Sequence, residues 1–185
     1  MSPRVFQVFE SIARRYWTVP PRRVLEVGAS SWTLLASPVF GSAHCIGLNL
    51  SIPTHKGALA HSGYVVANGN RLPFASATLD CVLSSSVLEH DKYFWRSTSE
   101  IRRVLRPGGL FIVGVPVYAT LPTDFRNTTL TFRRHGLAYD ADFYRFSEQA
   151  VREVLLEGLR PFEEIMVRRY PNPYMVAAGS KESAA

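Results

Sequence analysis

Short apolar runs alternate with helix-type patterns along this chain, and that alternation limits its possible folds more than any other feature. Five apolar runs, several ending at small or polar residues, are predicted to be strands: 23–28, 44–50, 64–67, 78–84 and 110–115. Strands that alternate with helices predict right-handed βαβ units and a parallel sheet. The sequence therefore predicts an α/β protein with helices on both faces of the sheet.

The helices are predicted from periodicity and from stop signals. Residues 4–17 repeat apolar side chains on one helical face, and Pro20-Pro21 ends the pattern. Further helices are predicted in four places: a short one from near Trp32, and longer ones over 53–61, 91–106 and 147–158. Residues 117–146 have no clean period and are predicted to be irregular.

Two more strands are predicted at 162–169 and 174–178, joined by a short Pro-Asn-Pro link. A link that short requires an antiparallel hairpin. The total is about seven strands, of which the last is antiparallel. No linker separates a second domain, so residues 1–185 are expected to form a single domain, with 1–20 as an N-terminal helix.

Composition narrows the function classes. The net charge is +6, but the arginines come in scattered pairs, so a solvated basic surface is favoured over a nucleic-acid interface. Cys45 and Cys81 lie in apolar runs and are expected to be buried thiols, and no Cys/His spacing resembles a zinc site. No apolar stretch approaches the ~20 residues of a membrane span, and no secretory leader is evident, so a cytoplasmic protein is expected.

Ligands of open parallel sheets bind beyond the carboxyl ends of the strands. The residues there are small, polar and largely uncharged, which suits a nucleoside-bearing ligand better than a metal or a polyphosphate. Residues 28–32 read Gly-Ala-Ser-Ser-Trp, with one glycine, so the G-x-G-x-x-G pattern of dinucleotide sites is missing. Hydride transfer and ATP chemistry are both disfavoured.

Several motifs together resemble the class I S-adenosylmethionine (SAM)-dependent methyltransferases. Residues 24–28, Val-Leu-Glu-Val-Gly, resemble motif I of that superfamily. Three further segments resemble the middle block of motifs in that superfamily: Leu-Pro-Phe at 72–74, Leu-Asp-Cys-Val at 79–82 and Ser-Ser-Val-Leu-Glu-His at 85–90. Residues 100–109 resemble its E-x-x-R-V-L-x-P-G-G signature, and 142–147 are similar to a late segment of small bacterial members.

This resemblance implies a Rossmann-like seven-stranded sheet, SAM as the cofactor, and a set of contacts. Glu26 would support the glycine loop and the methionine amine, Asn49 would bond the ribose, and Ser85 would lie beside the methionine. The full set of cofactor residues implied is Glu26, Gly28, Ala29, Ser30, Asn49, Leu50, Asn68, Gly69 and Ser85.

The chain departs from the family pattern in three places. Ser30 and Trp32 replace two motif glycines, and Asn49 and Asn68 replace acids on the ribose and adenine sides. Losing a charge-assisted hydrogen bond costs ~1–3 kcal/mol, so two such changes would weaken cofactor affinity by ~10–1000-fold unless compensated. The alternative roles are local: Glu26 as a cap of the following turn, and both asparagines as turn residues.

Catalytic and acceptor residues are less defined. His90 and His135 are candidate bases, and His90 has a structural role as its alternative. Tyr118, Tyr139, Tyr144 and Arg145 are candidate acceptor contacts, with 117–146 as a lid over the acceptor. The alternative is a surface lid of packed aromatics. Pro-Asn-Pro-Tyr at 171–174 resembles an amino-methylation motif but follows the wrong strand, so it is interpreted as a hairpin turn.

Three functions remain open from sequence. The first is methyl transfer to a small molecule, with the acceptor pocket formed by this chain or completed by a second subunit. The second is a non-catalytic methyltransferase-like partner protein, for which the replaced acids argue. The third is methylation of RNA, for which only the positive charge argues.

Overall fold

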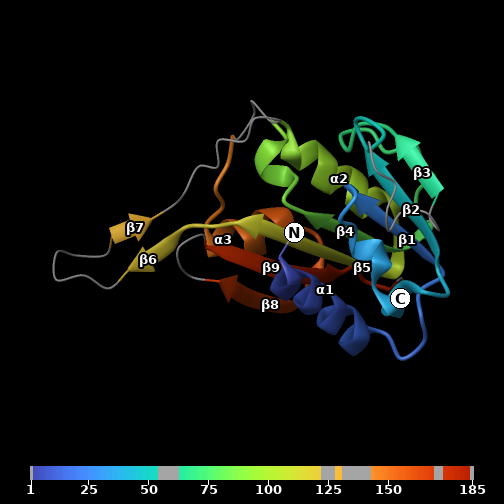
Figure 1. Cartoon of the computed structure of the whole chain (residues 1–185), viewed down its shortest axis with the longest axis horizontal. Coiled ribbons are helices and arrows are strands. Elements are labelled where there is room, and N and C mark those ends of the chain that lie inside the picture. The colour runs from blue at the N-terminus through green and yellow to red at the C-terminus, as the bar shows by residue number, and fades with distance from the viewer. Residues whose placement is uncertain (1, 54–62, 122–127, 131–142, 169–172, 184–185) are drawn as a thin grey trace.

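The computed structural model describes residues 2–53, 63–121, 128–130, 143–168 and 173–183. Within those ranges seven strands form one sheet in the order β3-β2-β1-β4-β5-β9-β8 (Figure 1). The strands are β1 Arg23–Val27, β2 His44–Asn49, β3 Gly63–Val66, β4 Leu79–Ser85, β5 Leu105–Pro116, β8 Arg160–Arg168 and β9 Tyr174–Ser180. Strand β9 runs antiparallel to the other six strands of this sheet, so the predicted Rossmann-like sheet with an antiparallel last strand is confirmed.

Alternation along the central strands builds a core on each face of the sheet. In β1, Leu25 and Val27 join one core, whereas Val24 joins the other. Because both faces are covered, these strands are nearly continuous apolar runs. That is the pattern by which the sequence revealed them.

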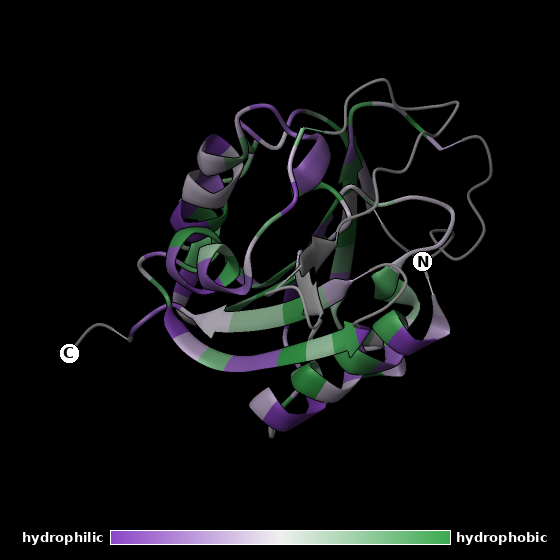
Figure 2. Ribbon diagram, turned by 90° about the vertical axis from the view of Figure 1, so that its left-hand side faces the viewer, coloured by the Kyte–Doolittle hydropathy of each residue, from purple (hydrophilic) through white to green (hydrophobic). Residues whose placement is uncertain are grey.

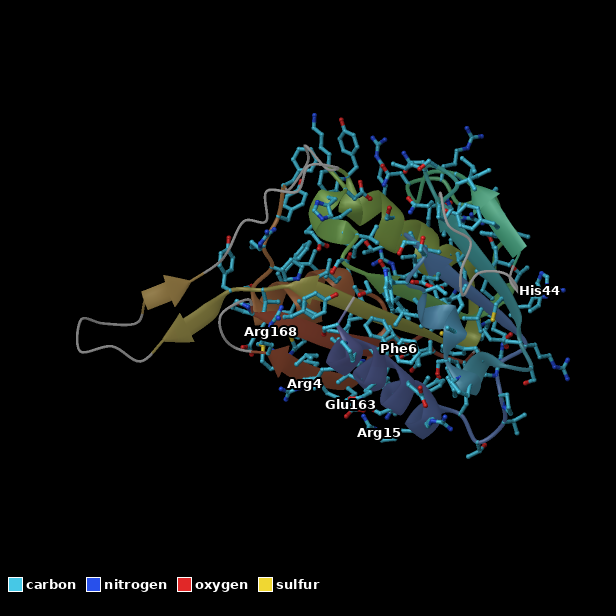
Figure 3. All side chains as sticks on the ribbon, in the orientation of Figure 1. Arg4, Phe6, Arg15, His44, Glu163 and Arg168 are labelled. Atoms are coloured by element: carbon cyan, nitrogen blue, oxygen red, sulfur yellow. The ribbon has the colours of Figure 1, made fainter. Side chains whose placement is uncertain are left out.

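Helix α1 (Pro3–Tyr16) covers one face, against β8, β9 and β5. The Ser2 hydroxyl accepts a hydrogen bond from the Val5 amide and begins the helix, and Phe9 and Ile12 enter the core. The Arg15 guanidinium reaches across to β8, where its Nε donates to Oε2 of Glu163 at 2.9 Å (Figure 3). The helix predicted at 4–17 is confirmed.

Helix α2 (Phe94–Val104), the short α3 (Glu148–Ala150) and the π-type turn η5 (Val151–Leu155) cover the other face, so helices lie on both sides of the sheet (Figure 2). The Ser147 hydroxyl accepts from the Ala150 amide, as a capping residue should. Among the described residues, no helix is both long and apolar enough to cross a bilayer.

Some predicted elements differ from the observed ones. The helix expected from Trp32 is two 3₁₀ turns, η1 (Leu34–Ala36) and η2 (Pro38–Phe40), because Thr33 and Ser37 each cap a new turn before a helix can lengthen. The helix expected over 91–106 is α2, which is shorter, and a separate 3₁₀ turn, η4 (Leu88–His90), precedes it. Strand β5 then begins at Leu105, so the Pro-Gly-Gly sequence lies inside the strand and not before it.

The segment predicted to be irregular contains a small two-stranded sheet. Strands β6 (Ala119–Leu121) and β7 (Thr128–Leu130) pair antiparallel and project beyond the end of β5 (Figure 1). Backbone hydrogen bonds pair these two strands. The sequence has no alternating apolar pattern here, so it did not predict them. The helix expected over 53–61 falls almost entirely outside the described residues.

Candidate functional site

The loop after β1 is attached to the end of β2 through the backbone. The amides of Gly28 and Ala29 both donate to the Leu48 carbonyl, at 2.7 and 3.0 Å. Gly28 has φ +83°, and a Cβ there would lie 2.1 Å from Cγ2 of Val87. Only glycine meets both constraints, so Gly28 is where the loops after β1 and β4 come closest.

Glu26 lies directly before this loop and is buried. Its Oε2 accepts from the Thr33 hydroxyl and from the amides of Leu34 and Leu35, so it caps the turn η1. Burial raises the pKa of Glu26 to about 7, against the opposing effect of those three donors. The capping role that the sequence allowed as an alternative is therefore present, and direct contact with a cofactor stays a prediction.

Asn49 ends β2 with both ends of its amide in use. Its Nδ2 donates to the Ala29 carbonyl at 3.0 Å, and its Oδ1 accepts from the Leu50 amide at 2.8 Å. The hydroxyl of Tyr64 lies 2.8 Å from the Ser51 carbonyl and 3.3 Å from that of Ala29. These contacts bind the loops after β1 and β2 together, while the Leu50 side chain stays exposed.

The loop after β3 is fixed by a polar cluster that the sequence reading missed. Asn68 accepts from the Asn70 amide at 2.9 Å, which is the turn role weighed from sequence. The Asn70 amide group donates to Asp91 and to Ser97 at 2.6 and 2.8 Å. A Cβ on Gly69 would lie 2.9 Å from the Ser97 hydroxyl, so this loop packs tightly on α2.

Ser85 and Ser86 end β4 and face a tyrosine from the last strand. Their hydroxyls lie 2.9 and 3.1 Å from the Tyr174 hydroxyl. Tyr174 is buried, and burial, with a smaller effect from Glu89, raises its pKa. The sequence predicted Tyr174 to begin the last strand, next to a hairpin turn, and gave it no role in the site; it does begin β9, and its hydroxyl reaches the candidate site.

The candidate base His90 lies just after this loop. Its side chain is 28% exposed and its Nε2 lies 3.8 Å from the buried Glu89 carboxylate. The Glu89 backbone carbonyl also accepts from the amides of Phe143 and Tyr144. The structure thus brings His90 close to the end of β4, and its chemical role stays a prediction.

The candidate acceptor residues are spread over one side of the site. Tyr118 is 40% exposed just beyond β5. Tyr144 donates its hydroxyl to the Lys92 carbonyl at 2.9 Å and packs edge-on against Phe94, so the packed-aromatic alternative describes it well. Arg145 donates to the Tyr144 carbonyl. His135 and Tyr139 lie outside the described residues.

The loops after β1, β2, β3 and β4 form a rim whose chemistry suits a nucleoside-bearing ligand. Amides and hydroxyls supply neutral donors and acceptors, and Leu50 and Val66 expose apolar surface next to them, at 70% and 54%. No group of three or more acidic, His or Cys residues able to hold a metal occurs within the described ranges. A separate hollow, lined by Tyr16, Gly108 and Lys181 among others, lies at the opposite end of the sheet.

Comparison with known proteins shows a similarity to methyltransferases. Residues 25–113 match the methyltransferase domain family. An uncharacterized methyltransferase of Mycobacterium sp. strain JLS is 37% identical over 100 residues, covering 52% of this chain and 40% of that protein. The match thus spans about two fifths of the length of that relative.

Solved structures share the fold across nearly the whole chain. The 1,6-didemethyltoxoflavin-N1-methyltransferase of Burkholderia thailandensis, with bound 1,6-didemethyltoxoflavin and S-adenosylhomocysteine, has a TM-score of 0.73 at 20% identity, covering 96% of this chain and 78% of its own. The [4+2]-cyclase SpnF has a TM-score of 0.72 at 14% identity, covering 97% and 81%. Residues 25–113 are therefore similar to a methyltransferase domain, and the described sheet has the fold of SAM-dependent methyltransferases.

Proposed function

We propose that this chain transfers a methyl group from SAM to a small-molecule acceptor. One observation carries the proposal: the loop after β1 is joined to the end of β2 at the Leu48 carbonyl, and Val87 beyond β4 packs against Gly28. Three strand ends therefore form one neutral, partly apolar rim at the edge where ligands of parallel sheets bind. The resemblance to class I methyltransferases assigns the cofactor to the same edge.

The residues of the rim divide into recognition roles. The backbone of Gly28, Ala29 and Ser30 would lie against the cofactor, and Ser85 would lie on the methionine side. Leu50 offers exposed apolar surface to the adenine ring, flanked by Asn68 and Gly69. When bound, SAM supplies an electrophilic methyl group, so the protein chiefly has to orient the acceptor and exclude water.

A small acceptor is supported by what lies beside β5. Tyr118 and the aromatic side chains of Phe94 and Tyr144 are on that side, and the 117–146 segment is proposed as its cover. The Burkholderia protein of similar fold is a 1,6-didemethyltoxoflavin-N1-methyltransferase, solved with 1,6-didemethyltoxoflavin bound. If the acceptor is a hydroxyl, His90 is the proposed base that takes its proton; an amine acceptor needs no such base.

The test is turnover. Purified protein is incubated with SAM and a panel of small hydroxyl- and amine-bearing molecules, and S-adenosylhomocysteine (SAH) is quantified by mass spectrometry. We expect acceptor-dependent SAH formation that the Gly28→Ala variant loses. His90→Gln should lower turnover with hydroxyl acceptors and leave amine acceptors unaffected if His90 is the base.

A non-catalytic role is the second candidate. The side-chain oxygens of Asn49 and Asn68 accept from the backbone amides of Leu50 and Asn70, which leaves less capacity for ribose and adenine. The fold is also shared with a cyclase, so fold alone does not fix the reaction. Tight SAH binding without turnover on any acceptor would favour this candidate over methyl transfer.

A further inference from the structure

Asn49 stands where the class I pattern has an acid, and its side chain both donates one hydrogen bond and accepts another. The Leu50 amide must face an oxygen and the Ala29 carbonyl must face an N–H, so the two partners fix the same orientation of the side-chain amide. A carboxylate could accept from Leu50 but could not donate to Ala29. An asparagine at position 49 therefore satisfies both backbone partners in the ligand-free protein, whereas an aspartate would satisfy only one.

The Ala29 carbonyl depends mainly on this one donor. Tyr64 carries a single hydroxyl proton, and its oxygen is nearer to Ser51 (2.8 Å) than to Ala29 (3.3 Å), so that proton is better placed for Ser51. Ala29 is fully buried, where an unpaired carbonyl is costly. An aspartate at position 49 would place a second oxygen near that carbonyl and repel it.

We propose that Asn49 is a positioning residue that holds the Gly28–Ser30 loop in its ligand-binding shape by donating to the Ala29 carbonyl. Restoring the family acid at this position would therefore weaken cofactor binding. The binding part of this proposal rests on the proposed function, since it takes SAM as the ligand of the rim. The loop-holding part stands on the ligand-free protein.

Asn68 provides a matched comparison. It also stands where the family has an acid, but its side-chain oxygen accepts a hydrogen bond from the Asn70 amide. An aspartate can keep that bond. The same Asn-to-Asp change is therefore expected to have opposite results at the two positions.

The experiment measures two quantities for wild type, Asn49→Asp and Asn68→Asp: the melting temperature without ligand and the Kd for SAH by calorimetry. For Asn49→Asp we expect a melting temperature lower by about 3–6 °C and SAH binding weaker by about tenfold. Asn68→Asp should keep the melting temperature of wild type and bind SAH as tightly or more tightly. Asn49→Ala, which removes the donor without adding charge, should shift both quantities in the same direction as Asn49→Asp and substitutes for it if that variant does not fold.

Two results overturn the inference. If Asn49→Asp binds SAH more tightly with an unchanged melting temperature, Asn49 is a ribose contact that an acid improves. If Asn49→Asp and Asn49→Ala both melt like wild type, the loop does not need the donor. Absence of SAH binding by wild type would instead count against the proposed function, while the melting temperatures still decide the loop-holding role.

Discussion

The two ends of the central sheet are held together by different chemistry. At the amino ends, the Asp80 carboxylate accepts from the Arg23 amide and the Arg106 guanidinium, and Lys181 donates to the Arg102 and Leu105 carbonyls. At the carboxyl ends most links are amides and hydroxyls, from Asn49, Tyr64, Asn70 and Tyr174. The acidic groups there are Asp91, which accepts from Asn70, and the buried Glu26, which caps η1. Figure 3 marks the two ends, with His44 beginning β2 and Arg168 ending β8.

This difference separates stability from binding. Charged links are strong when both partners stay fixed, so they suit an end that has only to hold the strands. Neutral groups lose less hydration when a ligand covers them, so they suit an end that exchanges water for a cofactor. We therefore expect mutations at the amino end of the sheet to change folding alone, and mutations at its carboxyl end to change both folding and ligand binding.

The largest effect is expected from Gly28→Ala at the carboxyl end. The positive φ and the overlap with Val87 should together cost about 4 kcal/mol of unfolding free energy, measured by urea titration, and SAH binding should be lost. Gly63→Ala is the control, because its Cβ would meet only ordinary contacts at 3.8 Å and beyond. Equal unfolding curves for the two variants would remove the constraint assigned to Gly28.

The next effect is a pH dependence at Glu26. Because the folded-state pKa, about 7, lies above the ordinary 4.5, folding takes up a proton between these values, and stability falls as pH rises from about 4.5 to about 7. The full fall is about 3 kcal/mol at most. Urea unfolding across this range should show the slope in wild type and a flatter profile in Glu26→Gln. A slope unchanged in that variant would assign the titration to another group.

Asp80 should give the opposite slope at lower pH. Hydrogen bonds from Arg106, Arg23 and Arg22 outweigh the effect of burial and lower the pKa of Asp80 below its ordinary 3.8. Its contribution is therefore complete above about pH 4 and is lost as pH falls through the lowered pKa. At pH 7, Asp80→Asn should cost about 2 kcal/mol of unfolding free energy and leave the Kd for SAH within about twofold. A large loss of SAH affinity would break the proposed division between the ends.

The smallest effect is expected from removing one tyrosine hydroxyl at each end of the sheet. Tyr174→Phe removes the hydroxyl shared by Ser85 and Ser86, and Tyr16→Phe removes one that bonds the Gly108 carbonyl at 3.0 Å. Each should cost about 1 kcal/mol of stability. Only Tyr174→Phe should weaken SAH binding, by about threefold in calorimetry. Equal binding by both variants would show that Tyr174 does not position the end of β4.

The sequence predicted the strands well because each is an apolar run with a clear end, and buried parallel strands need little else. It predicted the 3₁₀ turns poorly, since Thr33 and Ser37 compete as caps within a few residues. The sequence located the candidate site at the carboxyl edge of the sheet, but it did not predict the side-chain contacts there. Ser85 and Tyr174 are 89 positions apart, and Asn49 bonds a backbone carbonyl that has no sequence signature.

Hydrogen–deuterium exchange with and without saturating SAH tests the division between the two ends most directly. We expect SAH binding to slow exchange at the carboxyl end of the sheet, in residues 27–31, 48–51, 67–71 and 84–87. Exchange at the amino end, in residues 20–23, 78–81 and 105–109, should be unchanged. Protection confined to the amino-end segments, or no protection at the carboxyl ends despite measured binding, would contradict this division.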